Sequence, residues 1–286
     1  MSLAQHRQLN LAAAGRGLVL LVVLLVGSPL AVSPAAAVQQ APVPPPPTSM
    51  AAMGDSITQA ADACCWYGDH PANSWSTGTA AWDGTRSHYE RLRALNPAIT
   101  GRNHNVAVSG ARMSDGPGQA QRAVAQGVQY VTLLLGANDV CTSAPETMTD
   151  PETFRAQLRE TLRILDAGLS GRARIFVASI PNVHQLWNLF RADPVAAFVW
   201  DVADICQSML APGRTEAERA AVQARNVALN AILRDECGAY PRCRFDGLAV
   251  FNFPFQRVHV STLDYFHPSL AGQAALADVT WQASWW

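Results

Sequence analysis

Short apolar runs alternate with amphipathic segments along the chain from about residue 49 onward. The apolar runs that predict strands span residues 49–55, 103–110, 128–136 and 173–181. Helical periodicity predicts helices over 87–96, 118–127, 150–165, about 195–210, 214–236 and 269–281. The third apolar run is almost continuous, which is typical of a strand covered on both faces. This alternation predicts an α/β fold with a mostly parallel sheet and helices on both faces.

The first 48 residues follow a different pattern. Arg7 and Arg16 precede the nine-residue apolar run 18–26, and Ala35-Ala36-Ala37 follows it. This order indicates a signal peptide over 1–37, because nine apolar residues fall short of the roughly 20 that a spanning helix needs. Residues 38–48 then predict a Pro-rich, extended spacer, and 49–286 one folded domain. We therefore expect an exported protein with no membrane span after cleavage; the alternative is an uncleaved N-terminal anchor.

Charge and cysteine content narrow the possible partners and the compartment. The formal net charge is −1, so the composition gives no sign of the basic surface that a nucleic-acid partner would need. Six cysteines in an exported protein indicate disulfides. Cys237 and Cys243 flank a short turn and form the first pair that we expect, and Cys141 with Cys206 is the second. The sequence contains no C-x-x-C or H-E-x-x-H motifs, which are spacings that would indicate a metal site.

The segment after the first predicted strand is rich in cysteine and aromatic residues. Cys64 and Cys65 are adjacent, and either bridge each other or pair elsewhere. Trp66, Tyr67 and Trp75 follow closely. Because substrate pockets are mostly apolar, these aromatic residues are candidates for lining one, although they fit a core position equally well.

Polar residues follow the predicted strands at the edge where ligands bind in parallel sheets. The motifs in question are Gly54-Asp55-Ser56, Ser109-Gly110-Ala111, Gly136-Ala137-Asn138-Asp139 and, before the last helix, Asp264-Tyr265-Phe266-His267. We expect these segments to converge at one end of the sheet.

Together these residues fit acyl transfer by a serine nucleophile. The hydroxyl of Ser56 needs a base, which His267 can supply, and Asp264 can orient that imidazole. The oxyanion of the reaction needs preorganised donors. The backbone N–H groups of Ser56 and Gly110 and the amide of Asn138 are the candidates for this oxyanion hole.

Other interpretations of the same residues remain open at this point. Ser56 alone would fit a turn or helix cap. His259 is a rival base, but its flanking valines suggest a strand, and it has no paired aspartate. Asp55 and Asp139 are expected to bond loop backbone near the site rather than to act as the triad acid.

The four motifs, in this order, resemble the four blocks of the SGNH (GDSL-type) hydrolase family of lipases and esterases. The resemblance spans about residues 51–281. It implies a flavodoxin-like three-layer α/β/α sandwich and ester hydrolysis by Ser56, His267 and Asp264, with Gly110 and Asn138 in the oxyanion hole. It implies no metal and no organic cofactor. The stretch NSWSTG (73–78) and the cysteine after Asn138-Asp139-Val140 are similar to phospholipase B-like members.

The sequence therefore predicts a secreted, monomeric serine ester hydrolase. Lipid acyl esters are the first expected substrate, and O-acetyl groups on a carbohydrate are the alternative. From a different class, a non-catalytic extracellular binding domain on the same fold is also considered, because fold does not fix function.

Overall fold

The computed structural model describes residues 43–286, which form one compact unit. The expected signal peptide (1–37) and the first part of the expected spacer (38–48) lie outside the described residues. None of the helices in 43–286 combines the length and the apolarity that a membrane crossing needs.

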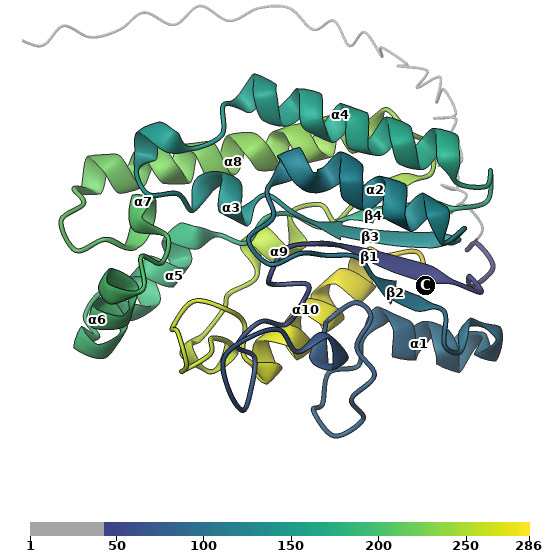
Figure 1. Cartoon of the computed structure of the whole chain (residues 1–286), viewed down its shortest axis with the longest axis horizontal. Helices are drawn as coiled ribbons and strands as arrows, with labels where there is room; N and C mark the ends of the chain where they lie inside the picture. Colours follow the sequence, from purple (N-terminus) through teal and green to yellow (C-terminus); the bar gives the residue numbers. More distant parts are fainter. Residues whose placement is uncertain (1–42) are drawn as a thin grey trace, which may run out of the picture. The chain divides into compact units, whose positions relative to one another are not determined.

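A five-stranded parallel sheet forms the centre of the unit (Figure 1). Its strands are β1 (Met50–Gly54), β2 (Asn103–Asn105), β3 (Tyr130–Leu134), β4 (Arg174–Val177) and β5 (Cys243–Phe245). The order is β2-β1-β3-β4-β5, and every neighbouring pair is parallel. This is the flavodoxin-like order, in which ligands bind beyond the carboxyl ends of the strands where the order reverses, next to β1 and β3.

Helices cover both faces of the sheet, as the sequence predicts. The helices are α1 (His88–Leu95), α2 (Gly116–Ala125), α3 (Ala137–Val140), α4 (Pro151–Gly168), α5 (Val183–Phe190), α6 (Pro194–Val202), α7 (Gln207–Leu210), α8 (Glu216–Gly238), α9 (Ala249–Asn252) and α10 (Leu270–Ala283). Figure 1 shows α2, α4 and α8 on one side of the sheet and α1 and α10 on the other. Both β1 and β3 are buried along their whole length, which explains their apolar sequences.

Helix starts follow the capping signals in the sequence. The Asp150 side chain accepts the backbone N–H groups of Glu152 and Thr153, and Pro151 occupies the first turn of α4. A proline fits there because its missing N–H would have no partner inside the helix. Ser269 caps α10 in the same way, by accepting the N–H of Gly272. This cap matters for the site, because it fixes where the chain leaves the loop that carries His267.

The region between β4 and α8 differs from the sequence-based expectation. We expected one helix over about 195–210, but α6 and α7 are separate helices. Asp204 and Cys206 lie between them in the left-handed region, at φ 51° and 45°. A right-handed helix cannot continue through such residues. Helix α5 and strand β5 were not expected.

The end of the Pro-rich segment lies against the domain. The indole Nε1 of Trp286 donates to the Pro44 carbonyl oxygen at 2.9 Å, and the Asn96 amide donates to the carbonyls of Pro46 and Pro47. The described part of the spacer is therefore in contact with the folded unit rather than free of it. The chain end also packs here, since the Trp286 ring lies 5.1 Å from the Tyr130 ring.

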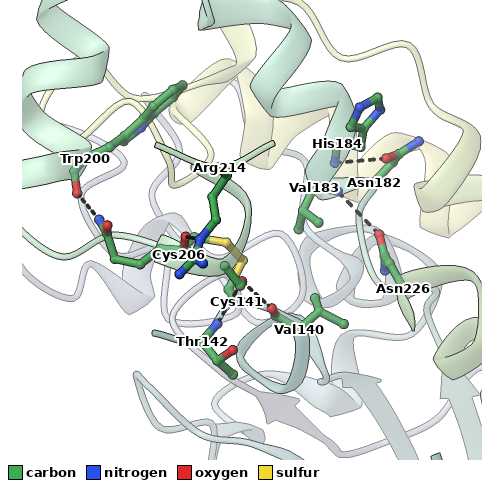
Figure 2. Close-up of a disulfide and its surroundings, with 12 residues drawn as sticks. Val140, Cys141, Thr142, Asn182, Val183, His184, Trp200, Cys206, Arg214 and Asn226 are labelled. Carbon is green, nitrogen blue, oxygen red and sulfur yellow. Dashed lines mark hydrogen bonds between the residues drawn. A yellow bond between two sulfur atoms is a disulfide. The ribbon is translucent and has the colours of Figure 1, made fainter. Parts of the chain in front are cut away.

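Two disulfides occur in the described residues, and they join the two pairs that the sequence favours. Cys237 is bonded to Cys243 across a separation of 6 residues, and Cys141 to Cys206 across 65. Figure 2 shows the second, which connects the segment after α3 to the start of α7. Cys64 and Cys65 are not bridged to each other or to another cysteine.

Candidate active site

A glycine at the end of β1 allows the tight turn that presents Ser56. A Cβ on Gly54 would lie 2.3 Å from Thr58 Oγ1 and 2.6 Å from the Leu134 carbonyl oxygen. Gly54 and Leu134 are paired residues of neighbouring strands, so neither backbone can retreat. The turn therefore requires glycine, and it places Ser56 just beyond the carboxyl end of β1.

Ser56, His267 and Asp264 form a continuous hydrogen-bonded chain. Ser56 Oγ lies 2.7 Å from His267 Nε2, although the residues are 211 positions apart. His267 Nδ1 lies 2.5 Å from Asp264 Oδ2. Because Nδ1–H donates to this carboxylate, Nε2 keeps its lone pair and can accept the serine proton. Asp264 Oδ1 also accepts the N–H groups of Phe266 and His267, which fixes the loop around the imidazole.

A second carboxylate, Asp62, faces the same imidazole. Its Oδ2 lies 3.6 Å from His267 Nδ1. Burial alone would lower the pKa of His267, but the hydrogen bonds and charges of Asp264 and Asp62 outweigh it and raise that pKa to about 9. Sequence reasoning missed Asp62, because it belongs to an irregular loop and to none of the four motifs. No sequence signal places it there, because its position depends on the irregular, left-handed backbone of the loop after Ser56.

Each candidate oxyanion donor keeps one N–H that has no acceptor among the described residues. Within residues 43–286, neither the Ser56 N–H nor the Gly110 N–H donates to another protein group. Gly110 has φ 81°, which favours glycine, and its loop is held beside the serine turn by a bond from Val108 N–H to the Gly54 carbonyl. The Asn138 amide donates one N–H to the Ala111 carbonyl at 3.0 Å, which leaves its second N–H for a ligand.

Asp55 and Asp139 bond loop backbone, as the sequence predicts. Asp55 Oδ1 accepts the Ile57 N–H at 2.9 Å, and Asp139 Oδ2 accepts the Met113 N–H at 2.9 Å. Both side chains are buried. Desolvation raises the pKa of Asp139 and raises that of Asp55 to about 7. Neither carboxylate is hydrogen-bonded to His267, so both hold loops at the sheet edge rather than orient the imidazole.

An apolar cavity opens beside His267. Its wall comes mainly from the segment around α5 and from residues 255–268. The apolar side chains that line it include Ile57, Leu186, Leu189, Phe255, Phe266 and Leu276. Ile57 and Phe266 are the direct chain neighbours of Ser56 and His267. The cavity therefore begins at the reacting groups.

The aromatic residues proposed from the sequence do not line this cavity. Trp75 is fully buried in the core, where its Nε1 donates to Thr58 Oγ1 at 3.3 Å. Trp66 and Tyr67 are 69% and 70% exposed. Trp75 thus takes the core position that the sequence left open, whereas Trp66 and Tyr67 turn out to solvent, so none of the three lines this cavity.

His259 also differs from the sequence-based expectation. It lies in a 3₁₀ turn (Arg257–His259) rather than in a strand, and its Nδ1 accepts the Gln256 N–H at 2.9 Å. It lines the cavity but is not bonded to Ser56. Desolvation lowers its pKa.

The cluster of Asp62, Asp264 and His267 is explained without a metal. One ligand atom from each lies within 4.8 Å of the others. While His267 Nδ1–H donates to Asp264, however, that nitrogen has no lone pair for a cation. The arrangement is that of two carboxylates beside the Nδ1–H of an imidazole.

Comparison with known proteins identifies the family to which this fold and this constellation belong. Residues 52–275 match the model of the GDSL-like lipase/acylhydrolase family. The chain belongs to this family. The family is one of lipases and acylhydrolases, as the four sequence motifs imply.

One curated relative and two solved structures show the range of similarity. The chain is 26% identical over 211 residues to a membrane-associated phospholipase B1 from Rattus norvegicus. The match covers 61% of this chain but only 14% of that protein. The crystal structure of LAE5, an α/β hydrolase from the metagenome of Lake Arreo, matches with a TM-score of 0.51 and 17% identity. A protein from Parabacteroides merdae described as a GDSL-like lipase matches with a TM-score of 0.52 and 17% identity. Each match covers 82% of this chain and 94% of the other, and supports the fold.

Proposed function

We propose that this protein is a secreted serine esterase that cleaves lipid acyl esters through an acyl-enzyme intermediate. The observation that carries the proposal is the hydrogen-bonded chain from Ser56 through His267 to Asp264, together with the apolar cavity that opens beside His267. A non-catalytic binding domain would have no need for a serine, a correctly oriented imidazole and free oxyanion donors in one place.

In the proposed mechanism, Ser56 Oγ attacks the ester carbonyl while His267 Nε2 takes the hydroxyl proton. Asp264 stabilises the imidazolium that forms. The carbonyl oxygen becomes an oxyanion, which the N–H groups of Ser56 and Gly110 and the Asn138 amide stabilise. His267 then donates its proton to the leaving alcohol as the C–O bond breaks. In the second half, His267 removes a proton from water, which attacks the acyl-enzyme carbonyl. The C–O bond to Ser56 then breaks as His267 returns this proton to Ser56 Oγ, and the carboxylic acid is released.

The apolar cavity favours an acyl chain over an acetyl group. A cavity wall of leucine and phenylalanine side chains gains stabilisation from each methylene that it removes from water, about 0.8 kcal/mol per CH₂. An acetyl group presents only one methyl to such a wall. The sequence similarity to a phospholipase B1 supports the same preference for a lipid ester.

Serine-directed labelling tests the mechanism. We expect a fluorophosphonate probe to label the native protein on Ser56, and Ser56→Ala to lose both labelling and ester hydrolysis while keeping its melting temperature. His267→Ala should also abolish turnover, and His259→Ala is the matched control because it lies in the same cavity but does not contact Ser56. Turnover that survives in Ser56→Ala, or that depends on His259 instead of His267, would remove the proposed mechanism.

A series of p-nitrophenyl esters from acetate to palmitate, with a diacyl phosphatidylcholine and acetylated xylan, tests the substrate. We expect kcat/KM to rise from acetate to chains of medium length. The highest value on acetate or on acetylated xylan would favour the carbohydrate esterase instead.

We also propose that the protein is exported, loses residues 1–37 and acts as a monomer. The Arg-flanked apolar run 18–26 and the two disulfides support export. Mass spectrometry of the protein from the culture medium should give a chain that starts at Val38. Light scattering after size exclusion should give the mass of one chain. A retained N-terminus would indicate an anchor.

A further inference from the structure

Asp62 is held on two sides, so that its second carboxylate oxygen has a fixed position. Its Oδ1 accepts the Gly68 N–H at 2.6 Å, and its own N–H donates to the Gly68 carbonyl at 2.9 Å. Its carbonyl oxygen accepts the Ser261 hydroxyl at 2.5 Å. The remaining atom, Oδ2, has no role in this loop framework and lies 3.6 Å from His267 Nδ1.

The two carboxylates beside Nδ1 have different roles. Asp264 makes a short hydrogen bond to Nδ1, which sets the tautomer and the ring orientation. At 3.6 Å, Asp62 is too far for a good hydrogen bond, but within the range in which opposite charges interact strongly. The side chains of Asp62, Asp264 and His267 are only 14%, 6% and 16% exposed, so solvent screens this charge interaction weakly.

The other groups around His267 do not balance this negative charge. Asp55, on the turn after β1, also interacts electrostatically with His267. On the cavity side the ring meets the Phe266 side chain, 4.9 Å away between centroids. His259 lines the same cavity, and burial favours its neutral form. Asp62 and Asp264 are the two carboxylates that lie directly at Nδ1.

We propose that Asp62 is a positioning residue that shares with Asp264 the stabilisation of the His267 imidazolium during acyl transfer. This inference rests on the proposed function and adds a second acid to the three residues that the motifs identify. Asp62 supplies the charge from the loop after the nucleophile, whereas Asp264 supplies it from the loop before the last helix.

The pH dependence of hydrolysis should report this interaction. His267 acts as a base only when it is neutral, so the acid limb of kcat/KM follows its pKa. Asp264 and Asp62 both raise that pKa. Removing the charge of Asp62 should therefore move the acid limb to lower pH. It should also reduce the plateau of kcat/KM, because the imidazolium of the transition state loses one stabilising charge.

Asp62→Asn is the variant to test, because it removes charge and little else. Asn keeps an oxygen for the Gly68 N–H, and it tolerates the left-handed backbone at position 62, where φ is 54°. With a soluble butyrate ester between pH 5 and 10, we expect the acid limb to fall by about one pH unit. The plateau should drop several-fold with little change in KM.

The matched control is Asp83→Asn. Asp83 accepts the Thr85 N–H and the Asn73 amide, so it also holds an irregular loop after the nucleophile, but it is not bonded to His267. Its variant should keep the wild-type acid limb. The inference would be overturned if the acid limb of kcat/KM in Asp62→Asn lay at the wild-type pH, or if it moved by the same amount in both variants.

A direct titration separates this inference from the proposed function. In ¹⁵N-histidine protein, the His267 resonances are assigned by their loss in His267→Gln and followed against pH. We expect the His267 midpoint to be lower in Asp62→Asn than in the wild type, even if no ester is hydrolysed. Absence of turnover with a shifted midpoint would refute only the esterase. Turnover with an unchanged midpoint would refute only the role of Asp62.

A double variant gives a second, independent measurement. In Asp264→Ala, Asp62 is the remaining carboxylate at Nδ1 in the described structure. Adding Asp62→Asn to this background should reduce kcat/KM by a larger factor than the same change does in the wild type. Equal factors in the two backgrounds would show that Asp62 and Asp264 do not act on one imidazole.

Discussion

The Cys141–Cys206 disulfide should contribute more stability than the other disulfide, and the two can be compared in one protein. It joins Cys141, directly after α3, to Cys206, directly before α7. Helix α3 carries Asn138. Hydrogen bonds surround it: the Ser208 N–H donates to the Thr142 carbonyl at 2.7 Å, and the Thr142 N–H donates to the Ser208 hydroxyl at 3.2 Å. The perturbation is the pair Cys141→Ala and Cys206→Ala.

The difference in loop length sets the expected magnitude. The Cys141–Cys206 bond closes a loop of 65 residues, for which loop-closure entropy predicts about 4 kcal/mol of stabilisation. The Cys237–Cys243 bond closes a loop of 6 residues, for which the same relation gives about 2 kcal/mol. For a domain of this size, 1 kcal/mol corresponds to about 2–4 °C in melting temperature. The first double variant should therefore melt about 8–16 °C below the wild type, and the second about 4–8 °C below.

Differential scanning calorimetry of both double alanine variants measures this difference. Each variant loses two sulfur atoms, so the second is a matched control for the change in packing. Activity at 20 °C should survive in both, because the hydrogen bonds between Thr142 and Ser208 remain. Equal losses in melting temperature, or a larger loss for Cys237→Ala with Cys243→Ala, would refute the loop-entropy reasoning.

Three further changes test other parts of the structure. Gly54→Ala should lower the free energy of unfolding by about 3 kcal/mol in urea titration, because its Cβ would overlap a backbone carbonyl; a loss below 1 kcal/mol would contradict the rigidity of this turn. Asn138→Ala should lower kcat by about 10²-fold with an unchanged melting temperature, and a normal kcat would remove it from the oxyanion hole. Burial lowers the pKa of His88 to about 3, so its contribution to stability is present above pH 6.5 and is lost as pH falls toward 3. His88→Gln should therefore flatten the fall in unfolding free energy between pH 6.5 and 4 by up to about 1.4 kcal/mol per pH unit, and an unchanged slope would contradict this.

The sequence predicts the centre of the fold well because buried parallel strands need apolar residues at successive positions. The runs that contain β1, β3 and β4 are of this kind. Strand β5 has only three residues, none of them fully buried, so its sequence carries no such run. The polar motifs could be placed for a related reason: they follow these strands directly, and parallel strands end at one edge of the sheet.

The aromatic residues after Ser56 could not be placed from the sequence, because the loop that carries them follows no periodic pattern. Ala60, Asp62 and Cys65 all have positive φ, at 52°, 54° and 69°. Such conformations are uncommon for residues with a Cβ, and no turn motif in the sequence predicts them. In this loop Trp66 is exposed, and Asp62 Oδ2 lies 3.6 Å from His267 Nδ1. The same irregular loop thus explains why none of the three aromatic residues lines the cavity and why the second carboxylate was missed. A left-handed backbone in three non-glycine residues costs free energy, and it persists where the surrounding contacts over-determine it. At Asp62 those contacts are the bonds to Gly68 and Ser261, and their effect is to hold a negative charge beside the proposed base.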